Sequence, residues 1–191
     1  MKRQLLLMLL LLPCITWAQD KFELTFNGFR NAADTTKDYV VIDIPNLDKA
    51  TLYKNAMIYL SKQYVSPKDV LSTVDNESIT INAVSQNAVK IKHLYLNPSW
   101  DVNYTITLQF RDNKVRVSEP SLNKISTRTG DIFRTVSINP YTGNGMNNKE
   151  IYNKKADLKL EDAKKNLEAF VNTYIENLNK GITSTNNQEE W

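Results

Sequence analysis

The feature that most constrains this chain is a series of segments in which apolar and polar residues alternate. The longest runs from Val102 to Phe110, where an apolar side chain occupies every second position. Shorter alternating runs lie at 78–82, 89–96 and 114–118. Because successive side chains of a strand point to opposite faces, this pattern predicts antiparallel strands with one buried and one solvent-facing side. Asp112 and Asn113 separate two of these runs, and both tolerate the left-handed backbone of a two-residue hairpin turn.

Two other segments have the apolar spacing of helices. The first spans about Lys49 to Gln63, after Asn46 and Asp48, either of which can cap it. The second places eight apolar side chains between residues 160 and 178 on one face, and Gly181 is positioned to end it.

The order of these elements predicts the fold class. Residues 39–44 are rich in β-branched side chains and end at Pro45, which indicates a mostly buried strand before the first helix. The order is then strand, helix, four strands, helix. Each element has one apolar face, so we expect an α+β domain from about Tyr39 to Gly181, with five antiparallel strands and two helices on one face of the sheet.

The N-terminus has the pattern of a secretory signal peptide. Lys2 and Arg3 precede an apolar run at 5–12, and small residues stand at the two positions that a signal peptidase recognises before Gln19. The apolar run is shorter than the ~20 residues that a membrane-spanning helix needs. We therefore expect residues 1–18 to be removed and the protein to be periplasmic or outer-membrane-associated, with no transmembrane segment left.

The lone cysteine, Cys14, lies within this signal. Lipidation of Cys14 is the alternative to its removal, but Pro13 stands where lipoprotein signals place a small residue. Without Cys14 the mature chain has no disulfide, thiolate metal site or cysteine nucleophile. Removal of Lys2 and Arg3 also lowers the excess of basic residues from three to one, from 24 Lys and Arg against 21 Asp and Glu. A general affinity for nucleic acid is therefore not expected.

Several segments together resemble a known family. They are residues 39–44, Leu52-Tyr53 with the helix that follows, 66–70, the strand 102–110 with its turn at 112–114, and 151–155. In this order they are similar to exported Bacteroidota proteins that carry a domain of unknown function with a TATA-binding-protein-like (TBP-like) fold. The resemblance implies a TBP-like β-α-β4-α fold, with an antiparallel sheet and two helices packed on one face. We expect the chain to divide into a signal peptide (1–18), a lead-in segment (19–38), the TBP-like domain (39–181) and a disordered tail (182–191). It brings no catalytic residues or cofactor with it.

The residues themselves indicate no catalytic, cofactor-binding or metal-binding site. His93 is the only histidine, and the alternation places it on the buried side of a strand between Ile91 and Tyr95. A general base needs a partner and a metal site needs several ligands, so we interpret His93 as a packed, hydrogen-bonded side chain.

Basic residues on the polar face of the sheet are the candidate binding site. If the alternation holds, they share that face with Thr105, Thr107 and Gln109, and no acidic residue occupies an outward strand position. Two interpretations stay open: the cations keep the sheet soluble and protect its edges, or they bind an anionic partner in the cell envelope. The candidate basic residues are Lys90, Lys92, Arg111, Lys114 and Arg116.

The segment from Ser121 to Asn148 is the second candidate. Its 28 residues exceed the ~12–15 at which structureless connections become uncommon, and Tyr141 provides an aromatic anchor for a partner. Alternatively, apolar residues at 132–138 form a further strand or a lid. The function we expect is that of an exported envelope protein, a non-enzymatic module that binds a protein or an anionic glycan. The alternative is an envelope enzyme whose site lies in this segment, and the sequence does not determine the oligomeric state.

Overall fold

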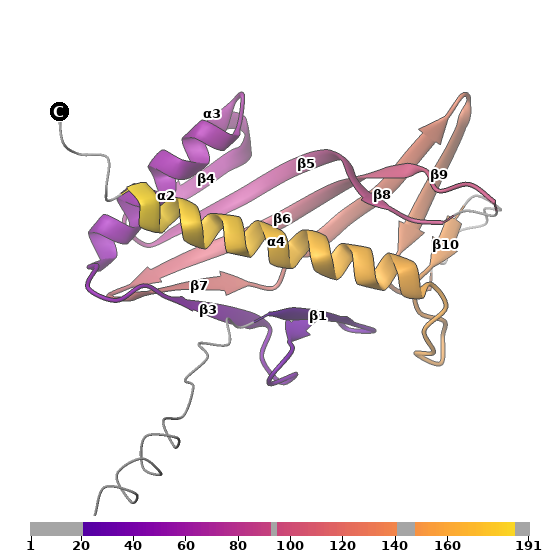
Figure 1. Cartoon of the computed structure of the whole chain (residues 1–191), viewed down its shortest axis with the longest axis horizontal. Coiled ribbons are helices and arrows are strands. Elements are labelled where there is room, and N and C mark those ends of the chain that lie inside the picture. The colour runs from indigo at the N-terminus through magenta and orange to yellow at the C-terminus, as the bar shows by residue number, and fades with distance from the viewer. Residues whose placement is uncertain (1–20, 93–94, 141–147, 186–191) are drawn as a thin grey trace, which may run out of the picture.

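The computed structural model describes residues 21–92, 95–140 and 148–185 (Figure 1). The expected signal peptide with Cys14, the histidine His93 and the candidate anchor Tyr141 lie outside the described residues. The described chain forms strands β1 (Phe22–Thr25), β2 (Gly28–Asn31), β3 (Tyr39–Asp43), β4 (Leu71–Val74), β5 (Ser78–Lys90), β6 (Ser99–Arg111), β7 (Lys114–Ser118), β8 (Ser121–Thr129), β9 (Ile132–Ser137) and β10 (Asn148–Glu150), and helices α2 (Lys49–Gln63), α3 (Pro67–Val70) and α4 (Glu161–Thr185).

The main sheet is built around the 13-residue strand β6. One edge of β6 pairs with β5, which pairs with β4. The other edge pairs first with β8 and then with β7, so the sheet divides there, and β9 and β3 pair with β8 and β7 respectively. All these pairs are antiparallel, and the short β9–β10 pair is parallel. Among the described residues the sheet thus has eight strands, more than the five expected, and is rich in antiparallel pairs without being wholly antiparallel.

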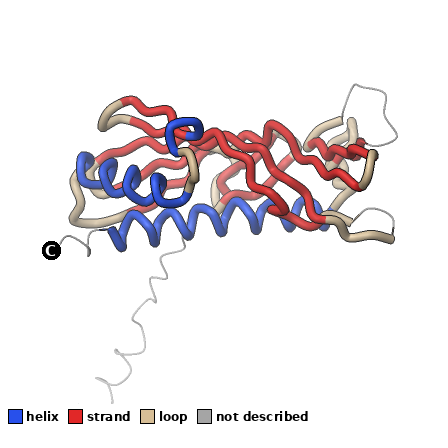
Figure 2. The backbone as a smooth tube through the Cα atoms, turned by 90° about the horizontal axis from the view of Figure 1, so that it is seen from above, coloured by secondary structure: helices blue, strands red, loops and turns tan. Residues whose placement is uncertain are grey.

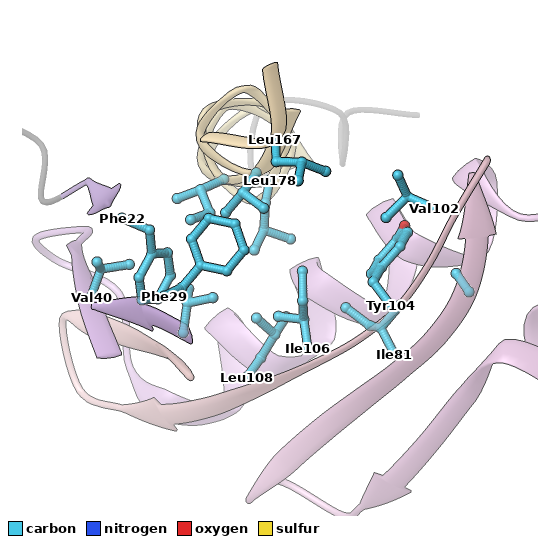
Figure 3. Packing of buried hydrophobic residues seen from close by; sticks show 14 of the residues in the cluster. Phe22, Phe29, Val40, Ile81, Val102, Tyr104, Ile106, Leu108, Leu167 and Leu178 are labelled. Atoms are coloured by element: carbon cyan, nitrogen blue, oxygen red, sulfur yellow. The ribbon is translucent and has the colours of Figure 1, made fainter. Parts of the chain in front are cut away.

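The two long helices cover one face of this sheet, which confirms the predicted α+β fold class. Figure 2 shows α4 running along the length of the sheet, with α2 beside one end of it. Asp48 caps α2, since its Oδ1 accepts a hydrogen bond from Thr51 N at 2.7 Å, and the helix has the predicted bounds. In the core, Leu167 and Leu178 of α4 lie over the sheet and belong to the same buried cluster as Phe29 and Ile106 (Figure 3).

Strand β5 joins two segments that the sequence pattern separates. The alternating runs at 78–82 and 89–96 were expected to form two strands, but β5 continues through both as far as Lys90. A register shift between Ser85 and Val89 accommodates the extra residues, and Asn87 in this bulge has a φ of 52°. Asparagine tolerates this left-handed conformation, so the interruption of the pattern is a bulge within one strand.

The expected lead-in segment contributes to the core through the β1–β2 hairpin. Phe22 of β1 is buried, and its backbone exchanges two hydrogen bonds of 2.9 Å with the side chain of Asn172 on α4. The next inward residue, Leu24, donates its N–H to Glu168 and accepts a hydrogen bond from Tyr152 Oη at 2.6 Å. Side chains therefore satisfy the edge of β1 where another strand would otherwise pair.

The C-terminal boundary also differs from the expected one. Helix α4 continues through Gly181 to Thr185, so residues 182–185 belong to the helix rather than to a tail. Gly181 does not end the helix. Its lack of a side chain instead makes room for the ring of Tyr59 on α2. Ile182 is buried in the following turn.

Most of the segment 121–148 is sheet, which corrects the expectation of a long loop. Strands β8 and β9 form a hairpin that extends the main sheet beside β6. Ile125 and Val136 are buried on it, whereas Ile132 and Phe133 near its tip are about half exposed. The alternative of an additional strand at 132–138 is therefore confirmed, since Ile132–Ser137 form β9 and pair with β8.

Candidate functional site: the open face of the sheet

A hollow of about 560 Å³ lies on the sheet near the turn between β6 and β7. We call it the basic hollow, because three of its lining residues are cations and one is a carboxylate. Its lining residues come from β3, β6, β7 and the start of β5, together with Glu77: Tyr39, Val41, Glu77, Ser78, Gln109, Phe110, Arg111, Lys114 and Arg116.

The β6–β7 hairpin brings the basic residues together. Asn113 adopts a φ of 65° in the predicted two-residue turn, which places Lys114 directly opposite Arg111. Two residues further along, Arg116 lies opposite Gln109 on the same face. Directly opposed side chains have Cβ atoms about 4.5–5.5 Å apart, so the cations and the amide form one cluster. The prediction that Arg111, Lys114 and Arg116 share the polar face is confirmed.

Strand β3 forms the second wall of the hollow. Val40 and Ile42 are buried, so Tyr39, Val41 and Asp43 face outward. Residues 39–44 are therefore not a mostly buried strand, because β3 alternates between the core and the open face.

Carboxylates neutralise some of these charges and leave others free. The Arg116 guanidinium lies 4.0 Å from the Tyr39 ring centroid and 3.6 Å from Asp38 Oδ1. Glu77 is paired with Lys49 at 2.5 Å. Within the described part of the chain, Arg111 and Lys114 have no ion pair. The hollow therefore presents the Arg111 guanidinium and the Lys114 ammonium group, with the Asp43 carboxylate opposite Lys114 on the neighbouring strand.

The remaining predicted basic residues lie elsewhere. Lys90 is opposite Ser99, at the far end of β6 from Arg111. At about 3.3 Å per residue, these ends are roughly 40 Å apart. Backbone groups of Lys90 and Lys92 bond to side chains on α4: the Lys90 carbonyl accepts from Asn166 Nδ2, and Lys92 N donates to Asp162 Oδ2, both at 2.7 Å. The five cations do not form one site, and Tyr141 lies outside the described residues.

The open face also has charged and aromatic side chains that the pattern did not indicate. Asp43 and Asp101 occupy outward positions, which corrects the expectation of no acidic residue there. Asp101 is engaged, since its Oδ1 accepts a hydrogen bond from Asn87 N at 2.8 Å in the β5 bulge. At the other end of this face, the ring centroid of Phe133 on β9 lies 4.6 Å from Lys124 Nζ. Phe133 is the second aromatic side chain on this face, after Tyr39, and only the pairing of β8 with β9 places it there.

A cluster of tyrosine hydroxyls lies on the opposite, helix-covered side. Tyr64 Oη is 3.1 Å from Tyr174 Oη and 3.3 Å from Tyr104 Oη, which links α2, α4 and β6. Burial raises the pKa of Tyr104 and of Tyr174 above the ordinary value. These phenols therefore stay protonated and uncharged at neutral pH, which suits packing and not nucleophilic chemistry. Across residues 21–92, 95–140 and 148–185, no group of three His, Cys, Asp or Glu side chains is arranged to hold a metal ion.

One comparison with known proteins assigns the central part of the chain. Residues 39–124 match the family model described as "Domain of unknown function (DUF4468) with TBP-like fold". These residues form a DUF4468 domain. The DUF4468 match covers α2, β3–β7 and the start of β8, so it includes every strand that lines the basic hollow. The predicted resemblance to a domain of unknown function with a TBP-like fold is thereby confirmed, whereas export stays a prediction.

Two solved structures are similar to the chain. One is a TBP-like protein from Parabacteroides distasonis, 16% identical, with a TM-score of 0.49 over 80% of this chain and 92% of that chain. The other is a DUF4468 family protein from Bacteroides ovatus, 10% identical, with a TM-score of 0.42 over 77% of this chain and 83% of that chain. No curated protein matches the sequence. Within the described residues, no helix has the length and hydropathy required to cross a membrane.

Proposed function

We propose that this protein is a non-enzymatic binding module of the cell envelope, and that its basic hollow holds the anionic group of a glycan. The observation that supports this most is the pair Arg111 and Lys114, which line the hollow and form no salt bridge among the described residues, although Asp43 stands opposite Lys114 across β3 and β7. Gln109 and Ser78 line the same hollow and add hydrogen-bonding groups beside the two cations. Its volume is within the ~300–1,000 Å³ typical of small-ligand sites.

The chemistry of the surroundings favours a glycan over a protein. Stable protein interfaces bury roughly 800 Å² on each partner around an apolar, often aromatic centre. The strand positions that continue outward from the hollow are Thr80, Asn82, Thr105 and Thr107, all of them polar; Asn82 is exposed and the three threonines are partly exposed. Hydroxyl and amide groups suit the hydroxyls of a sugar, and the cations suit its acidic substituent.

The envelope location rests on the first 18 residues of the sequence. Mass spectrometry of the protein from its native cells should find Gln19 as the first residue. A diacylated Cys14 would instead show a lipid-anchored protein, and an intact N-terminus would contradict export.

Calorimetric titration with D-glucuronic acid, and with neutral glucose as the matched sugar, tests the binding site. We expect the acid to bind and glucose not to bind. Each charge-assisted hydrogen bond contributes about 1.5–3 kcal/mol, so Arg111→Ala and Lys114→Ala should each weaken binding about tenfold or more.

The double variant Lys90→Ala, Lys92→Ala is the matched control. It removes two positive charges at the far end of the sheet and should leave the affinity unchanged. Equal weakening by this variant would show that only net charge matters, and absence of binding to the wild-type protein would refute the proposed site.

A further inference from the structure

A network of uncharged side chains crosses the open face beside the basic hollow. Thr105 Oγ1 donates to Asn82 Oδ1 at 2.8 Å and accepts from Asn123 Nδ2 at 3.0 Å. Ser121 Oγ donates to Asn123 Oδ1 at 3.1 Å. On the adjoining pair of positions, the hydroxyls of Thr80 and Thr107 lie 3.0 Å apart. We call these six residues the polar ladder.

The polar ladder is continuous with the hollow. Ser78 and Gln109, which line the hollow, are opposite one another on β5 and β6. The next outward pair along the same strands is Thr80 with Thr107, and the pair after that is Asn82 with Thr105. The hollow and the ladder are therefore successive parts of one surface.

The far end of the ladder has its own cation and aromatic ring. Lys124 lies opposite Asn103 on β6, next to the bulge that turns Asn123 toward the open face. The Lys124 ammonium lies against Phe133, whose side chain is about half exposed. Gln109 and Asn103 are six steps apart along β6, which corresponds to roughly 20 Å at the rise of a strand. The surface therefore extends well beyond the hollow, so a ligand longer than one sugar could contact it.

The hydrogen bonds within the polar ladder orient its side chains and leave donors and acceptors available for a ligand. A threonine hydroxyl has one donor and two acceptor positions, and an asparagine amide has two N–H donors and a carbonyl acceptor. The bonds within the ladder use only part of this capacity. Side chains held in one orientation lose less conformational entropy when a ligand binds. Because none of the six residues is charged, the ladder offers hydrogen bonds without attracting further anions.

We infer that the open face binds a linear acidic oligosaccharide, with its acidic sugar in the basic hollow and its neutral sugars along the polar ladder toward Lys124 and Phe133. The distribution of charge supports this occupant: cations gather at the hollow, and uncharged hydrogen-bonding groups follow. A uniformly charged polyanion would find no cation along the ladder itself. This inference rests on the proposed function and specifies the ligand of the same site.

Titration with aldouronic acids tests this arrangement. These probes contain one glucuronic acid linked to an increasing number of neutral xylose units. We expect the affinity to rise at least tenfold from glucuronic acid alone to the longer members. The double variant Thr105→Val, Asn123→Ala should lose this gain while its affinity for glucuronic acid stays unchanged. The matched control, Asn179→Ala on α4, on the helix-covered side of the sheet, should keep the gain.

The outcomes separate this inference from the proposed function. If glucuronic acid binds and longer aldouronic acids bind no better, the ladder is not a subsite and only this inference fails. If no member of the series binds, both fail. A gain that persists in the double variant, or tighter binding of an acidic peptide than of the longest aldouronic acid, would also overturn the inference. Thermal melts of each variant establish that it is folded, and Asn82→Ala replaces the double variant if that one melts early.

Discussion

Replacement of Gly181 by alanine should destabilise the protein, although the same change stabilises most helices. Gly181 lies inside α4, where a Cβ atom would overlap the ring of Tyr59 on α2. Alanine is favoured over glycine in a helix interior by about 1 kcal/mol. Overpacking of a close helix contact costs about 1–3 kcal/mol, and Tyr59 must move as a whole because the overlap involves the base of its ring.

The balance predicts a net loss of up to about 2 kcal/mol in the free energy of unfolding. For a chain of this size, each kcal/mol lowers Tm by about 2–4 °C. Urea unfolding at constant pH measures the loss, and comparison of the slopes shows whether the unfolded state has changed.

A double-mutant cycle identifies the cause. In a Tyr59→Ala background the overlap is gone, so Gly181→Ala should stabilise the protein by up to about 1 kcal/mol. The sign of the effect therefore reverses with the partner. If Gly181→Ala stabilises the wild-type protein, or destabilises both backgrounds equally, the close packing of α2 against α4 is refuted.

Two further predictions follow from the contacts of α4. Asn172→Ala removes both hydrogen bonds to the Phe22 backbone and leaves a half-buried strand edge unpaired. It should therefore lower the free energy of unfolding in urea by about 1–3 kcal/mol and make amide exchange faster at residues 22–31. Unchanged exchange at these residues would contradict the docking of the hairpin on α4. Burial raises the pKa of Tyr104 and of Tyr174, so the folded state keeps protons that the unfolded state loses above pH ~10. Stability should therefore fall as pH rises above ~10, and this fall should be shallower in Tyr104→Phe; equal slopes for the variant and the wild-type protein would be the contrary result.

The elements with a regular pattern could be predicted from the sequence. Strand β6 and its hairpin with β7 follow from strict alternation and from Asp112-Asn113, and α2 has the bounds that its apolar stripe and the Asp48 cap indicate. These features depend on interactions between residues close in sequence. The single apolar face of each element predicted two helices on one face of the sheet, the family resemblance implied the same arrangement, and the structure confirms it.

The elements that the sequence misplaced depend on distant partners. The bulge at Asn87 appears as a break in the pattern because only the pairing with β6 shows that β5 continues. Gly181 resembles a helix end until Tyr59 is placed against it. The hairpin of β1 and β2 is anchored by Asn172 from a helix about 150 positions later in the chain, which no local pattern indicates.

The candidate site was predictable only in part, because some of its residues come together through a local hairpin and others through distant strand pairing. Alternation correctly assigned Arg111, Lys114 and Arg116 to one face, because hairpin register follows from the turn. It could not show that Lys90 lies at the other end of the sheet, since alternation specifies the face and not the position along it. Tyr39 completes the hollow only through the pairing of β3 with β7, which joins segments more than 70 residues apart.

The most direct test of the central claim is a map of chemical-shift changes in the ¹⁵N-labelled protein during titration with an aldouronic acid. The account predicts saturable shifts at Gln109, Arg111, Lys114 and Arg116, extending to Thr105 and Asn123 with the longer oligosaccharides. Residues of the helix-covered face, such as those around Asn179, should not shift. Shifts confined to α4, or the same shifts with a neutral xylose oligosaccharide, would contradict an acid-binding site on the open face.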